Sequence, residues 1–273
     1  MEAVNYLDVP GARICYEVRG NGPVLVLAGS PMDAPSFAAL AELMADEHTV
    51  VTLDPRGVSR STVTDPEQDT TPELRADDVV AILDALGADT ADFLGSSGGA
   101  VTGLALAERH PGRLRVLVAH EPPLLELLPD AAEQRAATEH IIDTFHREGA
   151  GAAMAAFMAN AGYDLDQMEM VMGDPEEKSP EDQAREEAEA ARFYNHELRG
   201  TVSHRPDLRA VAAGAARVVV GIGEESGPLV THRTSTVLAE QLGVEPAVFP
   251  GEHVGFVTHP GDFAQTLRKV LAG

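Results

Sequence analysis

The sequence predicts an α/β protein with a mainly parallel central sheet, helices on both faces and an inserted helical lid. Three observations favour this class. Strand-like apolar runs alternate with helical patterns along most of the 273 residues, which is typical of parallel strands joined by helical crossovers. A glycine-rich turn at 95–99 connects one such run directly to a helical pattern. Between Pro122 and about Gly214, strand-like runs are missing and helical patterns take over.

The expected strands follow from the apolar runs and from the turn residues between them. The first two, at 5–9 and 12–18, flank Pro10 and Gly11 and are expected to form an antiparallel hairpin. The remaining strands are expected at 24–28, 49–53, 91–94, 114–119, 217–222 and 244–249, with helices between most of them.

The helical segment is inserted between the strand that ends at Ala119 and the one that begins at Arg217. A lid at this place would lie over the carboxyl ends of the strands, where α/β sheets bind ligands. Its helices are expected at 131–148, 151–161 and 180–198. The chain is therefore divided into a first part of the core (1–121), a lid (122–214) and a second part of the core (215–273).

Methionine is concentrated in the expected lid. Five of the eight methionines lie there, namely Met154, Met158, Met168, Met170 and Met172. Flexible thioethers suit an adaptable apolar wall over a substrate, and they equally suit the packing of the lid itself.

The most informative motif is the pentapeptide Gly95-Ser96-Ser97-Gly98-Gly99, which matches the G-x-S-x-G pattern of a nucleophile elbow. In this turn the serine adopts a strained backbone conformation, and the glycines two residues to either side leave room for it. The spacing selects Ser97, because Ser96 would have Leu94 in place of the first glycine. Ser97 is therefore the predicted nucleophile.

A serine nucleophile needs a histidine base, a group that orients the base, and donors for the oxyanion. His253 is the preferred base because it lies in the loop after the last expected strand. His259 is the alternative, although a surface or capping role is expected for it before the final helix. His120 and His196 are secondary candidates for the pocket, next to Glu121 and Glu197 respectively, with structural roles favoured for both.

Composition excludes several classes of function. The formal net charge of −24 disfavours nucleic acid and anionic membranes as partners, because both would be repelled. The chain has no apolar stretch of membrane-spanning length and no signal-like N-terminus, so we expect a cytoplasmic protein. Cys15, the single cysteine, is expected to be a core thiol. The histidines are scattered and no H-E-x-x-H or C-x-x-C pattern occurs, so neither a metal nor a cofactor is expected.

With the pentapeptide, two further segments make the chain resemble a lidded serine hydrolase of the α/β-hydrolase fold across essentially its whole length. Residues 25–31 are similar to the family's His-Gly-x oxyanion loop, with Ala28 where histidine is common. Residues 52–61 are similar to its D-x-R-G-x-G-x-S turn, with Ser59 in place of the second glycine. Within that turn, Asp54 and Arg56 are expected to be structural. The resemblance implies an oxyanion hole formed by the backbone N–H groups of Ser30 and Gly98.

The acid departs from the family pattern. The family usually carries an aspartate where this sequence has Ser226, three residues after the glycine that follows the strand at 217–222. Glu121 is the preferred replacement, because some haloalkane dehalogenases use a glutamate at this place and residues 110–121 are similar to theirs in spacing. Glu225 and Glu224 are the alternatives, and Glu121 would then only fix the lid entrance.

These features predict a cofactor-independent serine hydrolase that cleaves an ester, lactone or related acyl bond of an apolar small molecule through an acyl-enzyme. Its partner is expected to be that substrate, and the chain is expected to be a monomer or homodimer. Hydrolysis of a carbon–carbon bond and perhydrolysis remain open, since the same side chains support both. A non-catalytic ligand-binding protein of the same fold is the alternative from another class, and Ser226 motivates it.

Overall fold

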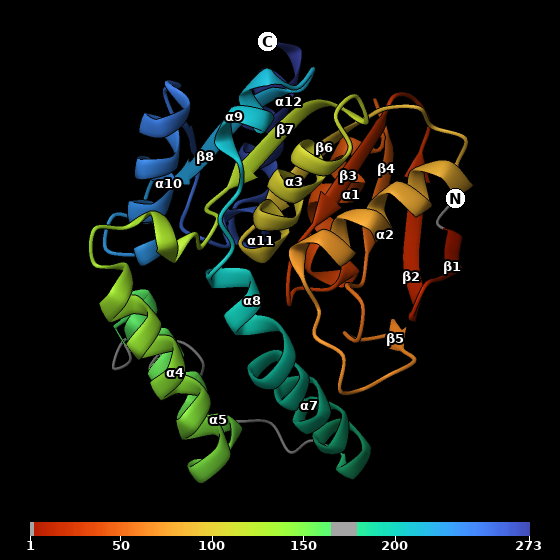
Figure 1. The fold of residues 1–273 in the computed structure, drawn as a ribbon. Helices are drawn as coiled ribbons and strands as arrows, with labels where there is room; N and C mark the ends of the chain where they lie inside the picture. The colour runs from red at the N-terminus through yellow and green to blue at the C-terminus, as the bar shows by residue number, and fades with distance from the viewer. Residues whose placement is uncertain (1–2, 165–178) are drawn as a thin grey trace.

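A twisted sheet covered by helices on both faces forms the core of the protein (Figure 1). The computed structural model describes residues 3–164 and 179–273. Its strands are β1 (Ala3–Val9), β2 (Ala12–Gly20), β3 (Val24–Ala28), β4 (Thr49–Leu53), β5 (Thr62–Val63), β6 (Ala91–Ser96), β7 (Leu114–His120), β8 (Arg217–Gly223) and β9 (Ala247–Phe249).

The strands lie in the order β1-β2-β4-β3-β6-β7-β8-β9, and the short β5 pairs with β2. β2 pairs antiparallel with β1, β4 and β5, whereas the pairs from β4 through β3, β6, β7 and β8 to β9 are parallel. The opening hairpin and the mainly parallel sheet are therefore confirmed. The parallel strands end at the same edge, so the loops after β3, β6, β7, β8 and β9 meet there.

The helices are α1 (Ala38–Met44), α2 (Pro72–Ala85), α3 (Gly98–Arg109), α4 (Ala131–Glu148), α5 (Ala150–Ala161), α7 (Pro180–Arg192), α8 (Leu198–Val202), α9 (Leu208–Ala213), α10 (Val230–Leu242), α11 (Gly255–Thr258) and α12 (Pro260–Ala272). The described residues also include the short helical turns η1 (Ala34–Phe37), η2 (Leu125–Leu127) and η3 (Phe193–Glu197).

Alternation along the strands divides the core into two apolar layers. In β3, Val26 belongs to the layer that also contains residues of α2, α3 and α10, whereas its neighbours Leu25 and Leu27 belong to the layer on the other face, with residues of α1, α11 and α12. Successive side chains of a strand point to opposite faces, so one strand supplies both layers. These two apolar layers fix the position of the sheet edge at which the candidate site lies.

The lid helices α4, α5, α7 and α8 gather at that edge, below the sheet in Figure 1. They have a core of their own, in which Ile141 of α4 and Ala153 of α5 pack with Tyr194 of η3. Phe145 stacks on Tyr194 with ring centroids 5.0 Å apart. The expected boundaries of the lid at 122 and 214 stay a prediction.

Two expected elements differ from the structure. The segment expected as a helix at 180–198 is helical throughout, but one turn of π-helix (η3) separates α7, which ends at Arg192, from α8. The strand expected at 244–249 is only three residues long. Its first half forms the turn after α10, because Val244 donates its N–H to the Ala239 carbonyl (3.0 Å), and Pro246 has no N–H to contribute to a ladder.

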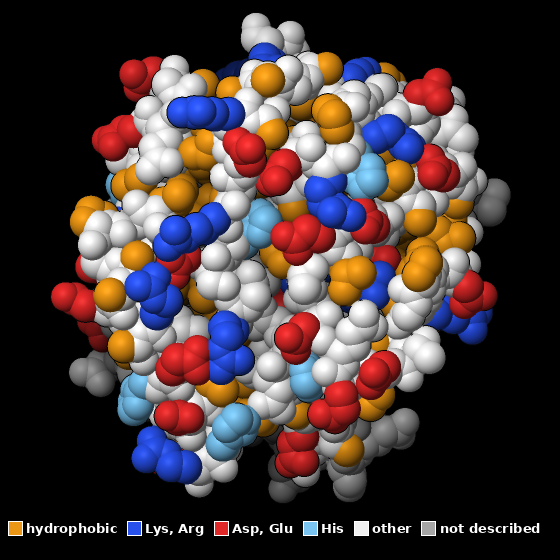
Figure 2. Space-filling view, in the orientation of Figure 1, with side chains coloured by type: hydrophobic (Ala, Val, Ile, Leu, Met, Phe, Trp, Pro, Cys, Tyr) orange, Lys and Arg blue, Asp and Glu red, His pale blue; other side chains and the backbone are white. Residues whose placement is uncertain are grey.

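Charged side chains are spread over the surface. On the face shown in Figure 2, acidic and basic side chains are interspersed, and they are not gathered into large patches of one sign. Among the residues with assigned structure, no helix is both long and apolar enough to cross a bilayer. Cys15 is buried in β2, as expected of a core thiol.

Candidate active site

Ser97 occupies a sharp turn between β6 and α3. Its backbone dihedrals are φ 56° and ψ −125°, a conformation that is uncommon for a residue with a side chain. The flanking glycines are required by packing. A Cβ on Gly95 would lie 2.3 Å from the Gly99 carbonyl oxygen, and one on Gly99 would lie 2.1 Å from that of Ala28. The predicted elbow is therefore present, with Ser97 at its apex.

Ser96 and Ser97 point to different surroundings. Ser96 is fully buried at the end of β6, and its Oγ lies 3.2 Å from Nδ1 of His120. Ser97, by contrast, lines the cavity between the core and the lid. Ser97 is therefore the serine of this pair that a ligand in that cavity can reach.

His253 lies in the loop after β9 and faces Glu121 at the end of β7. Nδ1 of His253 donates a hydrogen bond to Oε2 of Glu121 over 2.6 Å. His253 also lines the cavity beside Ser97. Because Nδ1 is engaged, Nε2 is the ring nitrogen left to serve a group in the cavity.

Glu121 is held rigidly and kept charged. Its side chain is 0% exposed, and its backbone has a positive φ of 51°. Oε1 accepts a hydrogen bond from the Gly223 N–H (2.9 Å), and Oε2 accepts a second one from the Thr231 hydroxyl (3.1 Å). Burial alone raises the pKa of this carboxyl, but the hydrogen bond from His253 and the nearby charges of His120 and His253 together outweigh it, and the pKa falls to about 2.

The alternative acids lie elsewhere. Glu224 and Glu225 are exposed, and their N–H groups bind the carbonyls of Phe249 and Gly251. Ser226, which follows Glu225 in the same loop, is buried. The structure thus brings Glu121 to His253, and it leaves Glu224 and Glu225 in solvent.

The other histidines occupy structural positions. His259 is exposed at the start of α12, where its Nδ1 lies 2.9 Å from the Thr258 hydroxyl. His196 binds Asp69 at 3.0 Å. His120 is fully buried, and burial lowers its pKa to about 4, so the ring is neutral at physiological pH.

Ser30 and Gly98 are packed against each other at the two loops where an oxyanion hole is expected. A Cβ on Gly98 would lie 2.7 Å from the Ser30 carbonyl oxygen, so glycine is needed for this close approach. Both residues line the cavity beside Ser97. Gly98 is also the first residue of α3, where the helix dipole favours negative charge.

The cavity has a volume of about 760 Å³ and its wall is mainly apolar. The lid contributes Ile141, Met154, Phe157, Met158, Phe193 and Tyr194 to this wall. Met168, Met170 and Met172 lie outside the described residues. Burial, and then the charges of Glu252 and Glu121, raise the pKa of Tyr163 in the wall. Its hydroxyl therefore stays protonated and can donate to a ligand.

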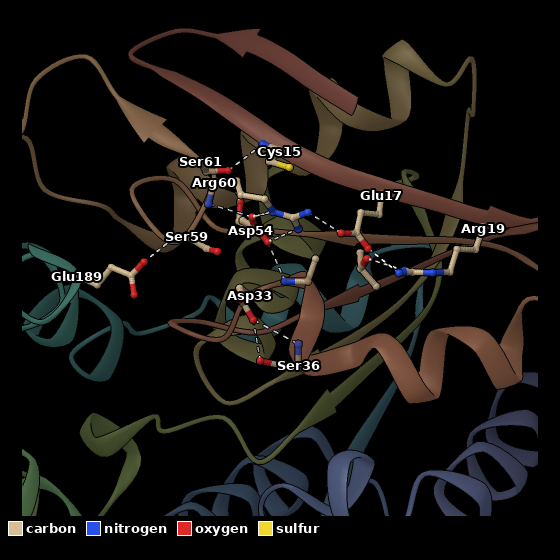
Figure 3. A network of polar contacts seen from close by, with 12 residues as sticks. Cys15, Glu17, Arg19, Asp33, Ser36, Asp54, Ser59, Arg60, Ser61 and Glu189 are labelled. Atoms are coloured by element: carbon tan, nitrogen blue, oxygen red, sulfur yellow. Dashed lines mark hydrogen bonds and ion pairs between the residues drawn. The ribbon is translucent and has the colours of Figure 1, made fainter. Parts of the chain in front are cut away.

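The loop after β4 is structural, as expected. Asp54 accepts hydrogen bonds from the Ala34 N–H (2.9 Å) and from Nε of Arg60 (2.7 Å), and Arg60 also binds Glu17 (Figure 3). In the same view, Glu189 of α7 accepts the Ser59 N–H over 3.0 Å. This loop therefore fastens one lid helix to the core.

Two partners in the site were missed by motif analysis. Thr231 lies in α10 and binds Glu121, and Arg75 lies in α2 and binds Glu197 of the lid. No local pattern marks either residue, because each contact joins segments more than 100 positions apart.

Comparison with known proteins identifies the family to which this fold belongs. The family model for the alpha/beta hydrolase fold matches residues 22–205. The uncharacterized hydrolase YraK of Bacillus subtilis is 32% identical over 97% of this chain and 94% of its own length. The zearalenone hydrolase of Cladophialophora bantiana is 29% identical over 97% of this chain and 96% of its own.

A solved enol-lactonase from Burkholderia xenovorans superposes with a TM-score of 0.73 at 20% identity, over 98% of this chain and 100% of that one. Its low identity makes this a likeness of fold. The family match and the relative at 32% identity show the relationship itself: the chain belongs to the α/β-hydrolase family.

Proposed function

We propose that this protein is a cofactor-independent serine hydrolase that cleaves an ester, lactone or related acyl bond of an apolar small molecule. The observation that carries the proposal is the 2.6 Å hydrogen bond between His253 and Glu121, beside a cavity that both His253 and Ser97 line. A nucleophile, a base and a buried acid are the parts that acyl transfer needs.

In the proposed reaction, Ser97 Oγ attacks the substrate carbonyl while Nε2 of His253 takes its proton. Glu121 holds the ring through Nδ1 and stabilises the imidazolium that forms. The N–H groups of Ser30 and Gly98 bind the oxyanion. His253 then gives its proton to the leaving alcohol, which leaves Ser97 acylated. Water, activated by the same histidine, releases the acid and restores Ser97.

The size and the wall of the cavity support an apolar substrate of drug-like dimensions, because about 760 Å³ falls in the range of small-molecule sites. A relative named zearalenone hydrolase, similar over almost the whole chain, makes zearalenone a reasonable first test compound. Tyr163 would supply one hydrogen-bond donor in a mainly apolar pocket.

The rival functions keep the same side chains. Carbon–carbon bond hydrolysis and perhydrolysis would use the same serine, histidine and acid, so only a substrate panel separates them. A non-catalytic ligand-binding protein requires an inactive Ser97. The hydrogen bond from His253 to a buried carboxylate speaks against that reading, because it is the arrangement that activates a serine.

Labelling with a fluorophosphonate probe tests the proposal directly. We expect stoichiometric modification of Ser97 in the wild type and none in Ser97→Ala. A panel of nitrophenyl esters, lactones and zearalenone should then give turnover that is lost in the same variant. An unreactive Ser97 with a folded protein would favour the binding protein, and turnover of carbon–carbon substrates alone would favour that rival.

We further propose a cytoplasmic monomer or homodimer whose partner is the substrate, without nucleic acid or membrane. The net charge of −24 supports the exclusion of polyanionic partners. Sedimentation analysis of the purified protein with and without duplex DNA or anionic vesicles checks this proposal.

A further inference from the structure

Glu197 of the lid reaches into the core and contacts the oxyanion loop. It lies in η3, and its side chain is 1% exposed. One of its oxygens, Oε1, accepts hydrogen bonds from the Ser30 hydroxyl and from Nη1 of Arg75 (3.0 Å). A lid residue therefore holds the side chain of one of the two residues assigned to the oxyanion hole.

Arg75 connects Glu197 to Gly98, the second residue expected in the oxyanion hole. Its Nε donates to the Thr102 hydroxyl over 2.9 Å, and that hydroxyl donates to the Gly98 carbonyl over 3.0 Å. Its Nη2 donates to the Thr201 hydroxyl of α8 over 2.9 Å. Each of the three nitrogens of this buried guanidinium therefore donates a hydrogen bond: Nη1 toward Ser30 through Glu197, Nε toward Gly98 through Thr102, and Nη2 to Thr201 of the lid.

The turn of π-helix in η3 places Glu197 for this contact. The Leu198 N–H binds the Phe193 carbonyl, five residues earlier. The His196 carbonyl accepts the Thr70 N–H from the core over 2.8 Å. Such turns are frequent at functional sites. The extra residue of the π-helical turn places Glu197 toward the core. The lid therefore binds the core through the backbone of His196 and through the side chain of Glu197.

We infer that Arg75 and Glu197 are positioning residues that set Ser30 and Gly98 for oxyanion binding when η3 and α8 are docked on the core. The inference rests on the proposed function. Donors act from about 2.7–3.1 Å away from the developing oxyanion, and a displacement of more than about 0.5 Å from that geometry weakens their effect. Because Ser30 and Gly98 are in close contact, a shift of either loop moves one donor relative to the other.

A purely structural ion pair is the competing explanation, and the chain offers a matched control. Arg56 binds Asp78 in an equally buried pair, with both side chains 3% exposed. The hydrogen bonds of Asp78 go to Arg56, and none of them goes to Ser30 or Gly98. Breaking the control pair should cost stability without disturbing the proposed oxyanion hole.

The test compares Glu197→Leu, Glu197→Gln and Asp78→Leu with the wild type, by kcat and KM on a nitrophenyl ester and by melting temperature. We expect Glu197→Leu to lower kcat about 10- to 100-fold with KM changed less than about threefold, since displacing a donor costs less than removing it. Glu197→Gln keeps an acceptor for Ser30 and should retain kcat within about fivefold. Asp78→Leu should lower the melting temperature and keep kcat within about twofold.

Thr102→Val is the second variant if Glu197→Leu does not fold. It removes the link between Arg75 and Gly98 with almost no change in volume, and we expect kcat to fall about three- to tenfold. Normal kcat in both Thr102→Val and Glu197→Leu, with lost stability only, would overturn the inference. A raised KM with normal kcat would make Glu197 a binding contact and would also overturn it. A wild type without turnover or labelling would instead defeat the proposed function.

Discussion

Glu121 directly follows β7, Gly223 ends the neighbouring β8, and the N–H of Gly223 binds the same carboxylate that His253 binds. The carboxyl group therefore crosses from β7 to the end of β8, where the family usually has its acid. Gly223 and Thr231 stabilise the ionised form with two hydrogen bonds, and an ionised acid is what a protonated histidine requires.

Glu121→Gln should lower kcat by several orders of magnitude with KM little changed, because the amide keeps the shape of the site but not its charge. Single-turnover measurement of acylation checks this expectation. Glu225→Gln is the matched control and should be mild, since Glu225 lies in solvent. A severe loss in Glu225→Gln beside a normal Glu121→Gln would return the acid to the loop after β8.

Ser97→Ala should abolish hydrolysis, whereas Ser96→Ala should keep a measurable rate. Ser97 lines the cavity, and Ser96 is buried against His120. Both variants are compared by turnover of a nitrophenyl ester after circular dichroism has shown that they are folded. The reverse pattern of activity contradicts the assignment of the elbow.

His253→Ala should be inactive and His259→Ala active, because His253 is the one of the two that touches Glu121. Steady-state kinetics of the two variants at pH 7 tests this prediction. Similar losses in both, with the fold intact, would show that the base is misassigned.

The apolar wall should accept acyl chains of short to medium length. Met154, Phe157 and Met158 line a cavity much larger than an acetyl group. A longer acyl chain would therefore bury more apolar area against these side chains. We expect kcat/KM on nitrophenyl esters to rise from acetate to hexanoate. A strict preference for acetate or for charged acyl groups would contradict the prediction.

Acidification should lower the free energy of unfolding over two ranges of pH. Burial lowers the pKa of His120 from 6.5 to about 4, so between these values the unfolded chain binds a proton that the folded chain excludes. The free energy of unfolding therefore falls as the pH drops through this range, by up to ~1.4 kcal/mol per pH unit. Glu121, whose pKa falls from 4.5 to about 2, adds a second loss of the same sign between those values.

Urea unfolding of the wild type and His120→Gln between pH 7 and pH 4.5 measures the first range. The variant should be less stable at pH 7 but should show a smaller decrease with acid. His140→Gln, at an exposed position of α4, should keep the wild-type slope. An unchanged slope in His120→Gln would rule out His120 as the source.

Local patterns predicted the parts of the structure that local chemistry decides. The glycine spacing located the turn at Ser97, since its backbone conformation excludes side chains at Gly95 and Gly99. Apolar runs located the strands, apart from β5, which has two residues, and the start of β9, where Pro246 cannot join the ladder. The helical run at 180–198 was confirmed, but the sequence did not reveal its turn of π-helix, in which the His196 carbonyl accepts the Thr70 N–H of the core.

The candidate site combined local and distant information. Glu121 was chosen from its place after a strand, but its distance to His253 depends on how β7, β8 and β9 are ordered in the sheet. Arg75 and Thr102 carry no motif, and their significance depends on a lid residue more than 90 positions away in the chain. Contacts of this kind follow from tertiary packing, which a sequence pattern does not contain.

The two halves of the lid are attached to the core in different ways, and this has an evolutionary consequence. α5 offers Met154, Phe157 and Met158 to the cavity, whereas α7 and η3 bind the core through Glu189 and Glu197. Substitutions in α5 should therefore alter which compounds fit while the reacting groups stay in place. Natural selection can therefore vary substrate preference through α5 while α7 and η3 are conserved, so related proteins can acquire new substrates without changes to the reacting residues.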